Sequence, residues 1–337
     1  MNVLIVTLKI VMGLLALFLA AAYFTLYERR LVSKFQDRIG PNRVGPNGVL
    51  QPIADAVKLI LKEDIVPARS DRFIHALAPT LAVFLSLAVI AILPIGNRMT
   101  IAGNDIPLVI SNAGVLFFLA ASSMSVYSVV LAGWGSVSKY SMYGALRSAA
   151  QMISYELSMG LAVAGAVILW GSLSLVDMVN AQGFGNLREI AMTLLAMPLF
   201  LVFFITGLAE TNRAPFDLPE AEGELVGGYH TEFSGLKFAM FFLAEYANII
   251  IISSIATTLF LGGWKGPGVL GLGNIPFIWF AIKVLALCSM FVWVRATLPR
   301  FRYDHLMDFG WKRLLPGTLV WVMIVAVVVA FWPKVNM

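Results

Sequence analysis

Six carboxylates are concentrated in one connecting segment of an otherwise apolar chain. Residues 210–233 read ETNRAPFDLPEAEGELVGGYHTEF, in which Arg213 is the only strong base. The acids are Glu210, Asp217, Glu220, Glu222, Glu224 and Glu232. The segment belongs to the face of the membrane where Lys and Arg normally accumulate. Topology alone therefore does not account for this accumulation of acids.

Ionisable side chains also lie within apolar segments. Glu156 stands in SYELSMG, Glu245 in LAEYANI, and Lys283 near the middle of another apolar stretch. Each such charge costs about 2.5–3.5 kcal/mol at the centre of a bilayer, and desolvated carboxyls can exchange protons near neutral pH. We interpret these residues as candidates for a proton path. The alternative is structural, with buried ion pairs or hydrogen bonds between helices and Lys283 paired with one of the acids.

The neighbours of two of these acids are polar at helical spacing. Ser148 and Gln151 precede Glu156, and Asn248 lies one turn beyond Glu245. Because residues at this spacing share a helix face, both acids should point into a helix bundle.

The composition predicts an all-α integral membrane protein. The chain of 337 residues is 59% hydrophobic and 13% charged, and its mean hydropathy is +0.85. A membrane helix needs about 20 apolar residues, and continuous rather than alternating apolar runs favour helices over a barrel. The predicted spans are 3–27, 73–95, 107–133, 148–170, 190–209, 236–261, 276–298 and 314–332. We expect one polytopic membrane domain over residues 1–337, with the first span retained as a helix.

The basic residues set the expected orientation. Most of them fall in the odd-numbered connections, which include residues 28–72 and 210–235. The positive-inside rule therefore places these connections in the cytoplasm and both termini on the periplasmic side. The formal net charge of +5 is explained by this bias, so it gives no reason to expect a nucleic-acid partner.

The first cytoplasmic connection should contain a helix. After the turn-forming RIGPNRVGPNG, the residues Ile53, Ala56, Val57, Ile60 and Leu61 recur on one helix face, with Asp55, Lys58, Lys62 and Glu63 on the other. This amphipathic pattern predicts a helix that lies along the membrane surface or against a partner.

The chain carries no signature of a redox centre. Cys288 is the only cysteine, and the three histidines, His75, His230 and His305, are dispersed. One cysteine supports neither a disulfide within the chain nor a cysteine-ligated iron–sulfur cluster, and no dinucleotide fingerprint is present. Any electrons must come from a partner.

Four long motifs resemble a known family. They are ERRLVSKFQDRIGPNRVGPNGVLQPIADAVKLILKE at 28–63, AGWGSVSKYSMYGALRSAAQMISYE at 132–156, LAETNRAPFDLPEAEGELVGGYHTEF at 208–233 and RATLPRFRYDHLMDFGWKRLLP at 295–316. In content and order they are similar to the family of H subunits of the bacterial proton-pumping NADH:quinone oxidoreductase, respiratory complex I. The resemblance extends over essentially the whole chain.

The resemblance implies a membrane subunit that forms the entrance and floor of a quinone chamber and couples quinone reduction to proton translocation. The candidate quinone-binding residues are Glu28, Arg29, Arg38, Asp55, Arg213, Phe216, Asp217 and Glu220. The candidate proton path comprises Glu156, Glu210, Glu222, Glu224, Glu232, Glu245 and Lys283. The third predicted span contains no carboxylate, so water or Ser122, Ser123 or Ser125 would have to serve there.

The same resemblance implies the setting of the chain. Quinone is the expected substrate and no cofactor is expected in this chain, whereas FMN and iron–sulfur clusters belong to partner subunits. The expected partners are the hydrophilic quinone-module subunits, small membrane subunits and lipid, in the bacterial inner membrane. Alternatives are the equivalent subunit of a ferredoxin-, deazaflavin- or hydrogenase-linked complex, a stand-alone proton-coupled transporter, and a membrane anchor. A transporter predicts repeat symmetry and broken helices in matching halves, and an anchor does not explain the intramembrane acids.

Overall fold

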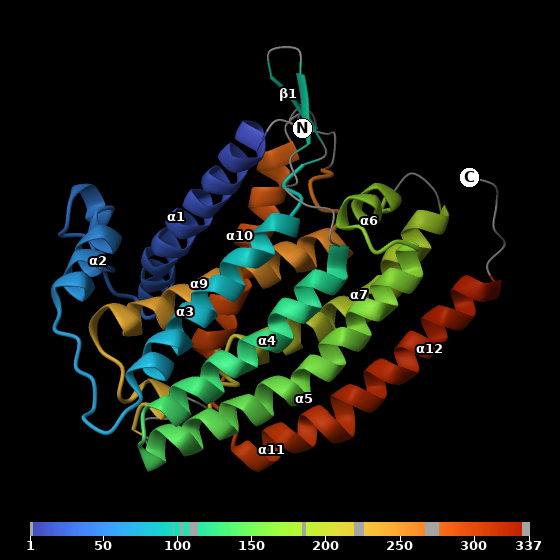
Figure 1. Cartoon of the computed structure of the whole chain (residues 1–337). Coiled ribbons are helices and arrows are strands. Elements are labelled where there is room, and N and C mark those ends of the chain that lie inside the picture. Colours follow the sequence, from blue (N-terminus) through green and yellow to red (C-terminus); the bar gives the residue numbers. More distant parts are fainter. Residues whose placement is uncertain are drawn as a thin grey trace.

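The chain folds as a bundle of membrane-length helices (Figure 1). A computed structural model describes residues 3–96, 98–101, 104–107, 114–183, 187–218, 226–266 and 276–331. Within these residues, eight helices are long and apolar enough to cross a membrane. The expectation of an all-α integral membrane protein with about eight spans is confirmed.

The long helices are α1 Val3–Phe35, α3 Arg72–Val89, α4 Gly114–Gly135, α5 Lys139–Trp170, α7 Leu187–Glu210, α9 Gly235–Phe260, α10 Pro276–Thr297 and α12 Leu315–Phe331. The shorter helices are α2 Gln51–Leu61, α6 Leu175–Ala181 and α11 Tyr303–Asp308. Short 3₁₀ turns occupy Pro46–Gly48, Ile90–Ile92 and Gly228–His230, and a π-helical turn spans Phe309–Leu314. Strands β1 Arg98–Ile101 and β2 Asn104–Pro107 form one antiparallel hairpin.

Several helices are longer than the apolar runs that predicted them. α1 continues eight residues past its predicted end at 27, and α5 begins at Lys139 rather than at 148. The last span begins at Tyr303 rather than at 314, because α11, the π-helical turn and α12 are continuous. Backbone hydrogen bonds carry a helix beyond the hydrocarbon region, and long basic side chains at its ends reach water. Apolar length therefore underestimates helix length.

The third span is shifted in the other direction, because residue 107 ends strand β2 and α4 begins at Gly114.

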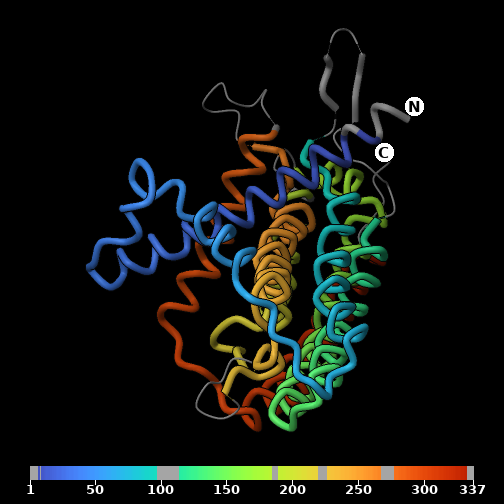
Figure 2. The backbone as a smooth tube through the Cα atoms, turned by 60° about the vertical axis from the view of Figure 1, so that its left-hand side comes forward, coloured from blue at the N-terminus to red at the C-terminus, as the bar shows by residue number. Residues whose placement is uncertain are grey.

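Two helices organise the bundle. α5 packs against α4, α7 and α12, and α9 packs against α3, α1 and α10. The amphipathic helix predicted near 53–63 is observed as α2, and it lies to one side of the bundle beyond the end of α1 (Figures 1 and 2). Its contacts within the chain are to α9 and α1.

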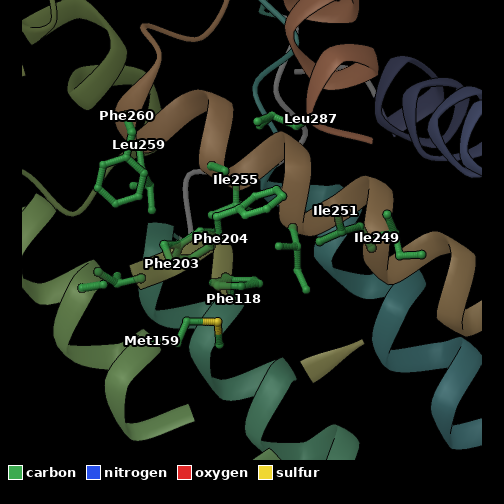
Figure 3. Close-up of a cluster of buried hydrophobic side chains, with 14 of the residues drawn as sticks. Phe118, Met159, Phe203, Phe204, Ile249, Ile251, Ile255, Leu259, Phe260 and Leu287 are labelled. Carbon is green, nitrogen blue, oxygen red and sulfur yellow. The ribbon is translucent and has the colours of Figure 1, made fainter. Parts of the chain in front are cut away.

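The largest core lies where α4, α5, α7 and α9 meet (Figure 3). Phe203 and Phe260 lie 5.8 Å apart between ring centroids, and Met159 and Ile255 are fully buried beside them. The buried hydroxyl of Thr257 donates to the carbonyl of Ser253 one turn earlier. This hydroxyl is thus satisfied within its own helix, which suits the membrane interior.

Gly144 permits a close backbone approach to α5. A β-carbon at Gly144 would lie 2.7 Å from Gly228 Cα and 3.0 Å from Tyr229 N, whereas one at Gly160 of the same helix would meet nothing within 4 Å. Gly144 therefore allows the 228–230 turn to pack directly on α5, in the manner of small residues at membrane helix contacts.

These two glycines make a matched pair for mutation. We expect Gly144→Ala to lower the thermal unfolding temperature of the detergent-solubilised protein, because the backbone of Gly228 cannot yield to a methyl group. Gly160→Ala should be neutral or slightly stabilising, since Ala is favoured over Gly in a helix by about 1 kcal/mol. Equal unfolding temperatures for both variants would show that the crossing does not depend on the missing side chain.

Candidate functional site

A cleft of about 830 Å³ opens beside the C-terminal end of α1. Its walls combine arginines, one buried acid and apolar side chains, and they are formed by Glu28, Arg29, Val32, Ser33, Phe35, Gln36, Arg38, Ile39, Gly40, Pro41, Tyr246, Arg295 and Ala296. The volume lies within the roughly 300–1,000 Å³ typical of small-molecule sites. The candidate residues Glu28, Arg29 and Arg38 are thus brought together in one cleft.

The extension of α1 builds one wall of the cleft. Glu28 and Val32 lie one turn apart on this helix, and the chain then turns back as Arg38 N donates to Ser33 O at 2.9 Å. Gly40 fits because a β-carbon there would lie 2.8 Å from Ser33 Oγ. Arg29 Nη1 pairs with Asp55 Oδ2 of α2 at 2.8 Å. Asp55 does not line the cleft itself, but its ion pair with Arg29 joins it to the rim of the cleft.

A buried ion-pair network lies behind the cleft. Arg213 Nη1 is 3.3 Å from Glu28 Oε1, and Arg213 Nε is 2.5 Å from Glu245 Oε1. Arg295 also pairs with Glu28 Oε1. The Arg213 guanidinium lies 4.6 Å from the centroid of the Tyr246 ring, within range of a cation–π interaction. We name Glu28, Arg213, Glu245 and Arg295 the central ion-pair network.

The charges of this network balance. Glu28 and Arg213 side chains are each only 7% exposed, so each needs a charged partner. Burial by itself would lower the pKa of Arg213, but the charges of Glu245 and Glu28 outweigh it and raise the pKa above its ordinary value. Arg213 therefore remains a cation that links Glu28 of the cleft wall to Glu245 of α9.

The segment after α7 is held by a glutamine. Gln151 Nε2 of α5 donates to the carbonyls of Ala209 and Phe216, each at 2.7 Å. Ser148 Oγ, one turn earlier, donates to Asn212 Oδ1 at 3.3 Å. The polar face predicted for α5 thus fixes residues 209–216, and with them the position of Arg213.

Two other candidates of this segment lie apart from the cleft lining. The Phe216 ring is buried between Tyr155 and Phe301, with centroid distances of 5.3 Å and 5.7 Å. Asp217 is buried and pairs with Arg300 at 2.9 Å. Their quinone-binding role stays a prediction. Glu220, Glu222 and Glu224 lie outside the described residues.

Glu156 and Glu210 form a second acidic site. Ser123 of α4 donates to Glu156 Oε1 of α5, so one of the serines proposed for the third span does meet an acid. Glu210 Oε2 at the end of α7 is buried and makes no hydrogen bond within the described residues. The two carboxyl groups are close enough to interact electrostatically.

Lys283 does not pair with a carboxylate in the described structure. Its Nζ donates to the carbonyls of Leu261, Gly263 and Lys265 at 2.6, 2.9 and 2.6 Å, just past the C-terminus of α9. Carbonyls at a helix C-terminus lack partners within the helix and attract cations. Of the two alternatives for Lys283, the pairing with an acid is not seen among the described residues, because these carbonyls satisfy all three ammonium hydrogens. Its role in a proton path stays a prediction.

The remaining acid, Glu232, belongs to a separate polar cluster. It interacts electrostatically with His75 at the start of α3. Lys237 and Asp64 complete this cluster, with Lys237 Nζ 2.9 Å from Asp64 Oδ2. The described proton-path candidates therefore do not form one chain of residues. Glu245 belongs to the central ion-pair network and Glu156 and Glu210 to the second acidic site, whereas Lys283 and Glu232 lie at two further places.

His230 is enclosed by aromatic rings. Its ring centroid lies 3.8 Å from that of Tyr229, 5.2 Å from Phe241 and 5.9 Å from Phe238. Burial lowers the pKa of His230 to about 3. His230 is thus neutral in the folded protein at physiological pH.

Two residues of the site were not predicted. Arg295 pairs with Glu28, and Tyr246 lies over Arg213 and on the cleft wall. In the sequence, Arg295 looks like any basic residue at the end of a span, and Tyr246 like a packing aromatic. Only the adjacency of Tyr246 to Glu245 could have drawn attention to it.

The chain is similar to a well-represented group of proteins. A family described as NADH dehydrogenase matches residues 8–326. An NADH-quinone oxidoreductase H subunit of Geobacter sulfurreducens is 50% identical over 314 residues, which cover 92% of each chain. The H subunit of Protochlamydia amoebophila is 51% identical over 312 residues, 92% of this chain and 93% of the relative. That of Rickettsia canadensis is 51% identical over 331 residues, 97% and 94% respectively.

The burial of His230 predicts a specific pH dependence of stability. An unfolded histidine binds a proton below about pH 6.5, whereas folded His230 does so only near pH 3. Because the folded pKa is depressed, the contribution of His230 is intact above pH 6.5 and is lost as the pH falls. At pH 5 the loss should be about 2 kcal/mol relative to His230→Phe, whose ring does not titrate. Thermal unfolding of both proteins between pH 7.5 and 5 measures this, and parallel curves would contradict it.

Proposed function

The chain belongs to the NADH dehydrogenase family as the H-type membrane subunit of NADH-quinone oxidoreductase, and we propose that its cleft is the membrane-side entrance to a quinone chamber. The observation that carries this proposal is the cleft itself, whose wall contains a buried acid joined to a buried arginine. In this proposal the central ion-pair network couples quinone reduction to proton translocation.

The cleft suits a quinone chemically. A quinone head group has two carbonyl oxygens that accept hydrogen bonds, and its isoprenoid tail is apolar. Arg29, Arg38 and Arg295 supply donors, whereas Val32, Phe35 and Ile39 supply apolar surface. Guanidinium groups make strong, directional bonds to oxygen acceptors, so they orient the head group while the apolar residues receive the tail.

The network explains how a charge in the cleft is felt inside the bundle. Reduction of quinone to quinol takes up two electrons from partner subunits and two protons. A change of charge or protonation at the Glu28 wall alters how strongly Arg213 is held by Glu245, since Arg213 touches both acids. Two unit charges 4 Å apart interact by about 4 kcal/mol at an effective dielectric of 20, enough to change the proton affinity of neighbouring groups.

Glu210 and Glu156 are proposed to carry protons onward. Both are acids of spanning helices, they interact with each other, and Glu156 is joined to Ser123 on α4. The acids of residues 219–225 are proposed to act between the cleft and this pair. Lys283 is proposed to be structural, because its donors are used by the end of α9.

The assembly follows from the same proposal. The electron donor and the FMN and iron–sulfur clusters are assigned to hydrophilic partner subunits, and the small membrane subunits and lipid surround the bundle. Both termini are proposed to lie on the periplasmic side of a bacterial inner membrane, which agrees with the eight candidate spans among the described residues.

The cleft assignment predicts a selective defect. We expect Arg29→Ala to lower quinone reduction by the assembled complex about tenfold, the effect of losing about 1.4 kcal/mol of interaction. Reduction of an artificial acceptor by the hydrophilic arm should be unchanged, since that reaction bypasses the cleft. Arg302→Ala is the matched control, because Arg302 is an exposed arginine paired with Asp304 outside the cleft lining. An equal loss of both activities in Arg29→Ala would contradict the assignment.

The coupling assignment predicts a loss of pumping. Glu156→Gln keeps an oxygen to accept from Ser123 but removes the titrating group, so assembly should survive while proton translocation falls. Asp177→Asn, at an exposed acid of α6, should pump normally. The measurement is proton uptake by reconstituted vesicles per quinone reduced, normalised to assembled complex. Full pumping by Glu156→Gln would remove this residue from the path.

A further inference from the structure

The polar cluster at the start of α3 and α9 lies apart from the cleft lining, and one of its members, Glu232, is a proton-path candidate. It consists of Asp64, His75, Glu232 and Lys237, together with the neighbouring Ser234. We infer that Lys237 is a positioning residue that holds α2, and through α2 the rim of the cleft, against the bundle. The inference rests on the proposed quinone function of the cleft.

Lys237 is the centre of this cluster. Its Nζ lies 2.9 Å from Asp64 Oδ2 and 3.3 Å from His75 Nδ1. His75 is fully buried and stacks on Phe233, with 4.1 Å between ring centroids. Lys237 therefore joins the segment that follows α2 to a rigid, buried part of the bundle.

Backbone contacts reinforce the same junction. Ser234 Oγ accepts from Ile65 N at 2.8 Å and donates to Glu63 O at 3.1 Å. Gly235 has φ +55°, and a β-carbon on it would lie 2.9 Å from Lys62 O. Residues 62–65 are thus fastened to residues 234–237 by one ion pair, two hydrogen bonds and a close backbone approach.

α2 needs this fastening because its apolar face is not packed in the chain. Ile53, Val57, Ile60 and Leu61 are between 49% and 79% exposed. Apolar burial within the chain therefore contributes little to the position of α2. Its position depends on polar contacts, which are the pair of Arg29 with Asp55 within the helix and the pair of Lys237 with Asp64 just after it.

The position of α2 is transmitted to the cleft. Arg29, which lines the cleft, pairs with Asp55 of α2. A β-carbon at Gly48, just before α2, would lie 2.2 Å from Pro41 O, and Pro41 also lines the cleft. A displacement of α2 therefore moves Arg29 and the segment around Pro41. The affinity of the cleft entrance for its ligand then changes, while the central ion-pair network stays in place.

The test uses the assembled complex with Lys237→Gln, Lys237→Arg and Ser234→Ala. Lys58→Gln, at an exposed lysine on α2 itself, is the matched control. Hydrogen exchange of peptides covering residues 51–66 reports whether α2 is held, independently of any quinone reaction. KM and kcat for a short-chain ubiquinone analogue report the entrance.

We expect Lys237→Gln and Ser234→Ala to speed exchange in this segment and to raise KM about fivefold, equivalent to about 1 kcal/mol, with little change in kcat. Lys237→Arg should restore both values, because it keeps the charge, and Lys58→Gln should match the unmodified protein. Unchanged exchange in Lys237→Gln would overturn the inference.

Faster exchange with unchanged KM would also overturn the inference, provided that Arg29→Ala still impairs quinone reduction. If neither Arg29→Ala nor Lys237→Gln alters quinone kinetics, the proposed function of the cleft fails and the inference fails with it. These outcomes separate an error about Lys237 from an error about the cleft.

Discussion

Arg213 is a buried cation shared by two acids, and the arrangement of the bundle follows from the need to keep it paired. A charge removed from water is tolerated only when opposite charges and hydrogen bonds replace its hydration. Glu28 comes from α1, Glu245 from α9 and Arg295 from α10, so three helices must meet at the segment that carries Arg213. Misplacing any of them strands a charge, which makes this meeting point a specific constraint on the fold.

The support for Arg213 comes from polar residues outside the central ion-pair network. Gln151 binds two carbonyls of the segment after α7, and Asp217 is held by Arg300. Such contacts fix a loop that has no regular secondary structure of its own. The same interactions that stabilise the fold therefore also hold the guanidinium within reach of the cleft wall, and stability and proposed function depend on one geometry.

The ionisable groups of the membrane region differ in what surrounds them. Glu28 and Glu245 share Arg213, Glu156 meets a serine hydroxyl, and Glu210 has a buried oxygen without a hydrogen-bond partner in the described residues. Lys283 is surrounded by main-chain carbonyls. A paired ion changes its charge at a high energetic cost, whereas a carboxyl group without a counter-ion has no such restraint. The proposed division between residues that transmit a change of charge and residues that exchange protons follows this contrast.

The membrane class, the eight spans and the amphipathic helix could all be predicted from the sequence, because apolar length and periodicity are local properties of the chain. Glu28, Arg29, Arg38 and Arg213 were also found as candidates, through motifs that are contiguous in the chain. Which of the candidates meet depends instead on how the helices pack. Arg295 is 267 residues from Glu28 along the chain, and the pairing of Lys283 with carbonyls depends on where α9 ends beside α10. Charge pairing over such separations is set by helix packing, and no local pattern records it.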